Sequence, residues 1–112
     1  MRIVELPQPI VTTRGEFGDG LAELVTAKLA PIAKHAHGPV LAIRVELERH
    51  VDPAVAHPVG ARADVNVNGR HVHAGATART VRDAIDSLVS RLVRQMDGRP
   101  RDRGRRGPRK PV

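Results

Sequence analysis

Apolar and polar side chains alternate along residues 61–77, and a two-residue turn interrupts the alternation. Every second position of 61–67 is apolar, and the positions between are polar. Successive side chains of a strand point to opposite faces, so this segment predicts a strand with one apolar face. Asn68-Gly69 follows, a pair that accepts the positive φ angles of a two-residue turn, and alternation resumes over 71–77. The segment therefore predicts a β-hairpin.

A helix is predicted directly after the hairpin. Thr80 can cap its first turn, Asp83 stands three residues on, and Gly98 marks its end. Apolar side chains recur at helical spacing and form one stripe, which comprises Val81, Ala84, Ile85, Leu88, Leu92 and Met96.

An earlier helix is predicted from about Asp19, a good cap residue, to about His35. Pro31 lies inside it and lacks a backbone donor, so we expect the last turn to kink or tighten. The apolar stripe comprises Leu21, Leu24, Val25, Leu29 and Ile32.

Two more strands are expected in the first half of the chain. Residues 2–6 begin the first one, Pro7 and Pro9 favour an edge position, and 10–13 can continue it in extended form. Residues 40–49 predict another, and residues 50–59 read as a loop with two prolines. One face of the 40–49 strand is expected to carry Leu41, Ile43, Val45 and Leu47.

The order of elements is β-α-β-β-β-α, which predicts an α+β fold. A right-handed strand–helix–strand unit followed by a hairpin gives one four-stranded mixed sheet. Each helix has a single apolar stripe, so both pack on one sheet face. We expect one domain over 1–98 and a basic, disordered tail over 99–112, because the tail has almost no apolar side chain.

Three segments resemble the ribosome hibernation promoting factor family, the short ribosome-associated translation inhibitors. They are V-N-V-N-G-R-H-V-H-A-G-A, D-A-I-D-S-L-V-S-R-L-V-R-Q-M and, upstream, L-A-E-L-V-T-A-K-L-A, and the resemblance covers roughly residues 1–98. It implies a fold similar to a double-stranded-RNA-binding domain. It also implies binding to the small ribosomal subunit in the channel for messenger and transfer RNA, which inhibits translation. Two features depart from the family: Arg82 replaces an aromatic residue, and the loop over 50–59 is longer.

Charge is concentrated at the end of the chain. The formal net charge is +7 and the pI about 11.4, and residues 97–112 hold seven Lys or Arg against two Asp. Such a tail is typical of a segment that binds polyanions, or of one that only keeps a protein soluble. There is no Cys, which excludes disulfides and thiolate sites, and no apolar run of membrane-spanning length. We expect no signal peptide.

Enzymatic chemistry finds little support. His71 and His73 share one strand face and could hold zinc if His50 and His57 converged on them, but sheet-surface histidines explain them more simply. Asp83 and Asp86 could form a carboxylate pair, but capping and helix-dipole compensation explain both. We expect no catalytic residue, no metal and no cofactor.

Basic side chains are the remaining candidates, as contacts to RNA phosphates. The expected RNA-binding residues are Lys28, Arg79, Arg82, Arg91 and Arg94, with Arg70 and His71 as weaker candidates near the hairpin. Weak tail candidates are Arg99, Arg101, Arg103, Arg105 and Arg106. With one Phe and no Tyr or Trp, stacking on exposed bases is disfavoured, so recognition of folded RNA through its shape and backbone is expected.

The resulting hypothesis is a cytoplasmic, monomeric ribosome hibernation factor whose partners are the small ribosomal subunit and its RNA. No membrane and no small-molecule substrate are expected. Two alternatives stay open: a general RNA- or DNA-binding module of nucleoid type that uses the same surface and tail, and an interaction domain for another protein.

Overall fold

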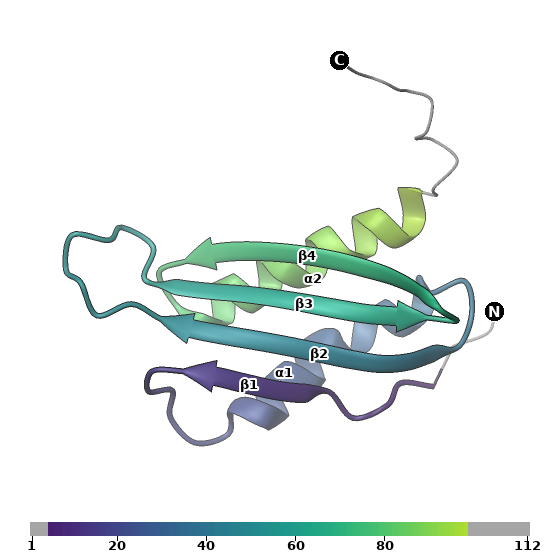
Figure 1. Cartoon of the computed structure of the whole chain (residues 1–112), viewed down its shortest axis with the longest axis horizontal. Helices are drawn as coiled ribbons and strands as arrows, with labels where there is room; N and C mark the ends of the chain where they lie inside the picture. The colour runs from purple at the N-terminus through teal and green to yellow at the C-terminus, as the bar shows by residue number, and fades with distance from the viewer. Residues whose placement is uncertain (1–4, 99–112) are drawn as a thin grey trace, which may run out of the picture.

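Four strands form one sheet, and the helices cover one of its faces (Figure 1). The computed structural model describes residues 5–98. The elements are β1 (Ile10–Arg14), α1 (Leu21–Leu29), the 3-10 helix η1 (Ala30–Lys34), β2 (Val40–Arg49), β3 (Val59–Val67), β4 (Arg70–Ala78) and α2 (Val81–Gly98). The strand order is β1-β2-β3-β4, with β1 parallel to β2 and the other pairs antiparallel. The predicted α+β class and element order are confirmed, while the predicted tail lies outside the described residues.

The β3–β4 hairpin turns at the predicted pair. Asn68 has φ 54° and Gly69 has φ 93°, as a two-residue turn with the twist of a hairpin requires. The Asn66 side-chain oxygen accepts a hydrogen bond from the Gly69 amide at 2.7 Å. This turn sets the register, in which Val65 lies opposite Val72 on the buried face.

Helix α2 supplies much of the core. Its first turn is capped as predicted, because the Asp83 amide donates to the Thr80 hydroxyl oxygen at 3.1 Å. Within residues 5–98 no helix is long and apolar enough to cross a membrane. The side chains that α2 buries against the sheet and α1 are Ala84, Ile85, Leu88, Val89, Leu92 and Met96.

Helix α1 begins and ends differently from a regular helix. Its N-cap is Gly20, with φ 81° and no side-chain cap, so the prediction that Asp19 caps the helix was wrong. A glycine reaches this left-handed conformation without the cost that a side chain imposes. The predicted tightening at Pro31 is confirmed: η1 follows α1 directly, and the Ala30 amide bonds the Ala27 carbonyl three residues back.

The first strand lies later in the chain than predicted. β1 starts at Ile10, residues 5–9 form no strand, and residues 2–4 lie outside the described part. Pro7 and Pro9 have no amide hydrogen to donate to a ladder, so regular pairing with β2 starts only after them. The predicted edge position is confirmed.

Leu41 does not share the buried face of β2. Its side chain is 55% exposed, whereas Val40 is buried, because the pairing of β2 with β3 shifts between Val40 and Ala42. An irregularity of this kind redirects the side chains before it. The prediction that placed Leu41 beside Ile43 was therefore wrong.

The different burial of two leucines predicts losses of stability that differ in size. Leu88→Ala should lower the free energy of unfolding by about 2–5 kcal/mol, because it leaves a cavity under α2. Leu41→Ala should change it by less than about 0.5 kcal/mol. Urea denaturation of both variants measures the difference, and similar losses would contradict the placement of Leu41.

Candidate nucleic-acid interface

The sheet face opposite the helices, here called the open face, carries charges that compensate one another. The cross-strand pairs of opposite charge are Arg14 with Glu48, Arg62 with Glu46, and Arg44 with Asp64. In one of them an Arg62 nitrogen donates to a Glu46 oxygen at 2.8 Å. A surface without net positive charge gains little from the counterions that phosphates release, so the open face is a poor site for RNA.

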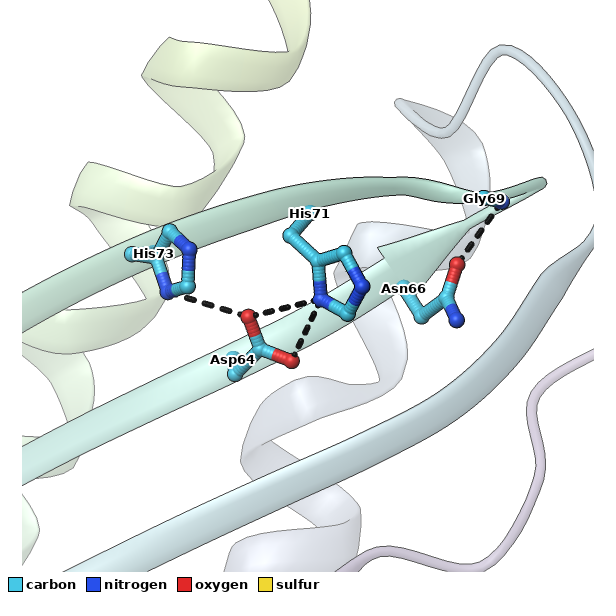
Figure 2. A network of polar contacts seen from close by, with 5 residues as sticks. All are labelled: Asp64, Asn66, Gly69, His71 and His73. Carbon is cyan, nitrogen blue, oxygen red and sulfur yellow. Dashed lines mark hydrogen bonds and ion pairs between the residues drawn. The ribbon is translucent and has the colours of Figure 1, made fainter.

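Two histidines on the open face share one carboxylate (Figure 2). Nδ1 of His71 lies 2.9 Å from one Asp64 oxygen, and Nδ1 of His73 lies 3.0 Å from the other. An ionised carboxylate only accepts hydrogen bonds, so both Nδ1 atoms carry a hydrogen. The two rings stack with centroids 6.1 Å apart. His71, a predicted RNA contact, therefore keeps only Nε2 for a partner.

The zinc alternative gains no support from this arrangement. Across residues 5–98 no three His, Asp or Glu side chains converge as metal ligands would. His71 and His73 do share a face, as predicted, but their Nδ1 atoms point at Asp64. Sequence reasoning missed Asp64, although the register of the hairpin places it opposite His73.

Helix α2 covers the outer edge of β4. The Arg91 guanidinium donates to the Gly75 carbonyl, and the Gln95 amide donates to the His73 carbonyl. β4 is an edge strand, so these carbonyls have no partner strand. Gln95 was not singled out from the sequence, although it stands four residues after Arg91 and so shares its helix face. Arg91 thus has a structural contact in addition to its predicted RNA contact.

An open hollow between α2 and β4 brings two predicted arginines together. The residues that line it are Ala74 and Gly75 of β4 and Arg91, Arg94 and Gln95 of α2. Arg94 is exposed, and no ion pair within residues 5–98 engages it. Its planar fork of donors suits a phosphate group. Ala74 and Gly75 are small, which leaves room for that group beside the strand.

Lys28 connects the two helices. Its ammonium nitrogen lies 2.8 Å from an Asp86 oxygen, and its side chain is 28% exposed. A phosphate would have to compete with Asp86 for this ammonium. The Asp86 carboxylate pairs with Lys28, whereas Asp83 contributes its backbone amide to the capped first turn.

The other predicted contacts are exposed but spread out. Arg79 and Arg82 lie near the start of α2, and Arg70 lies at the opposite end of β4, beside the hairpin turn. At roughly 3.3 Å per residue the length of β4 separates these ends by about 26 Å. The predicted set is therefore spread over β4, α2 and, through Lys28, α1, and does not form one cluster. Its tail members lie outside the described residues.

Solved structures of two proteins share this fold. The N-terminal domain of Thermus thermophilus Protein Y has a TM-score of 0.63 at 21% identity, covering 87% of this chain and 98% of that one. A ribosomal subunit interface protein from Coxiella burnetii has a TM-score of 0.63 at 18% identity, covering 80% and 93%. At these identities the likeness establishes the architecture, a small α+β domain with its helices on one sheet face.

Sequence comparison identifies the family. The family model described as Sigma 54 modulation protein / S30EA ribosomal protein matches residues 10–100. Ribosome hibernation promoting factor of Escherichia coli K12 is 31% identical over 84 residues, 72% of this chain and 79% of that protein. The Salmonella typhimurium LT2 protein of the same name is 30% identical with equal coverage. The chain belongs to this family, which confirms the resemblance found in the sequence.

The contacts of Arg91 and Arg94 predict different stabilities for their alanine variants. Arg91→Ala should lower the free energy of unfolding by about 1 kcal/mol, because it leaves an edge carbonyl without its donor. Arg94→Ala should stay within about 0.5 kcal/mol of the parent. Urea denaturation gives both values, and amide exchange in β4 should rise only for Arg91→Ala. Equal stability of the two variants would contradict the structural contact of Arg91.

Proposed function

We propose that this protein binds the small ribosomal subunit in the channel for messenger and transfer RNA and thereby holds ribosomes idle in the cytoplasm. The observation that carries the proposal is the family match over residues 10–100, which includes nearly all of the folded body. Two relatives that match most of this chain are named ribosome hibernation promoting factors. Occupying the channel excludes its RNA ligands by competition, and it requires no catalysis.

Phosphate contacts are proposed along the surface that carries Arg79, Arg82 and Arg94, here called the α2 side. Arg79, Arg82 and Arg94 are exposed, and none of the ion pairs in the described part of the chain engages them. Lys28 and Arg91 add charge while they hold neighbouring elements, and Arg70 and His71 are weaker candidates at the hairpin. Contacts to phosphates fix position without reading sequence.

The positive charge of the chain is distributed unequally between the body and the tail. Residues 5–98 contain eleven Lys or Arg and eleven Asp or Glu, so with neutral histidines the body has no net charge. The +7 of the chain comes from Arg2 and from residues 99–112. We infer that the tail supplies most of the long-range attraction to RNA and that the body determines where the protein sits.

The position of the arginines can be tested with two triple variants of equal charge. Arg79→Ala/Arg82→Ala/Arg94→Ala should weaken binding to purified small subunits and reduce the slope of log affinity against log salt by about two to three. Arg14→Ala/Arg44→Ala/Arg62→Ala removes the same charge from the open face. It should change the affinity and the salt slope far less. Sedimentation across a salt series measures both quantities.

Two outcomes would contradict this assignment. Equal losses in both triple variants would mean that net charge, and not the α2 side, governs binding. Tight binding to free duplex RNA or DNA without binding to small subunits would overturn the hibernation proposal and favour the nucleoid-type alternative.

The role of the tail is tested by ending the chain after Gly98. This truncation removes seven Lys or Arg and one Asp. It should reduce the slope of log affinity against log salt by about 0.7–0.9 for each phosphate contact that is lost. It should also weaken binding at physiological salt. The same titration with small subunits measures it, with saturation still at one copy per subunit. An unchanged slope would show that the tail only keeps the protein soluble.

A further inference from the structure

The loop between β2 and β3, residues 50–58, projects beyond the end of the sheet (Figure 1). Residues 50–57 are all exposed, so the loop does not pack on the body. Val51 is 91% exposed and Val55 is 37% exposed. The loop thus carries apolar side chains away from the core to which such residues ordinarily belong.

Bonds within the loop give it a defined conformation. At its base the His50 amide donates to the Pro58 carbonyl at 2.8 Å. At its tip the Val55 amide donates to the Asp52 carbonyl at 3.0 Å, and the Ala54 amide donates to an Asp52 carboxylate oxygen at 2.9 Å. Asp at the first position and Pro at the second suit such a turn. A preformed loop loses less entropy on binding than a flexible one.

The composition of the loop makes it a weak partner for phosphate. Residues 50–58 contain no Lys or Arg, and with His50 and His57 neutral their one formal charge is the carboxylate of Asp52. Valine offers no donor to a phosphate and no ring to stack on a base. An apolar side chain gains by leaving water for another apolar surface. The carboxylate beside it favours a partner with basic side chains around that surface.

We propose that the β2–β3 loop docks into a protein, with Val51 and Val55 entering an apolar recess that has a basic rim. The inference rests on the proposed function. If the protein binds the small ribosomal subunit, the partner of the loop is a protein of that subunit and not its RNA. The loop lies at the end of the sheet where β4 ends and α2 begins. It would therefore form a second contact beyond the arginines of α2.

Paired variants test the contact on intact small subunits. Val51→Ser/Val55→Ser should raise the dissociation constant about tenfold, because the apolar contact is lost while the exposed positions leave the fold intact. The control is Leu41→Ser, which removes an apolar side chain that is 55% exposed but lies outside the loop, and which should bind like the parent. A photo-crosslinking residue in place of Val51 should attach to a ribosomal protein.

The outcomes separate the two proposals. Normal binding of the parent protein with unchanged affinity of Val51→Ser/Val55→Ser, or crosslinks to RNA, would overturn the docking proposal and leave the hibernation proposal intact. Equal weakening in Leu41→Ser would also overturn it, because the effect would then not be specific to the loop. A parent protein that fails to bind small subunits would overturn both.

Discussion

The positive φ angles at Asn68-Gly69 are the local constraint on which the rest of the structure depends. Side chains alternate with a period of two, so a slip of β4 by one residue against β3 would turn the apolar positions of β4 toward the open face. With this turn, Val65 faces Val72 under the helices and Asp64 faces His73 on the other side. The core, the shared carboxylate and the edge carbonyls under α2 all follow from that one register.

The second constraint is the protection of the sheet edges. An edge strand presents unpaired backbone groups that invite pairing with another chain. On β4 the side chains of Arg91 and Gln95 occupy two such carbonyls, while β1 has only five residues and follows Pro9. Some polar side chains of α2 therefore stabilise the fold by protecting the edge of β4. This separates arginines that look equivalent in the sequence, because Arg91 is held by the strand and Arg94 is not.

Local sequence patterns predicted the helices and strands well. Features that depend on tertiary contacts could not be predicted from them. Alternation, the Asn-Gly pair and the helical stripe each involve neighbours in sequence, so the hairpin, α2 and the element order could be predicted. A register shift leaves no mark on alternation, so Leu41 was misplaced. The pairing of Lys28 with Asp86 depends on how α1 and α2 meet, which the sequence does not encode locally. The contact of Asp64 with His73 could have been deduced by counting outward from the turn.

Charge balance sets how such a molecule would engage RNA. The open face pairs its charges internally, and on α2 three arginines stand against three aspartates, so the body attracts polyanions weakly from a distance. Under the proposed function, the position of the protein on the ribosome then depends on short-range fit along α2. A cationic segment linked to the body raises the body's effective concentration near RNA without adding to that fit. Under the proposed function, affinity would respond steeply to salt and competing polyanions while the binding position stayed fixed by the body.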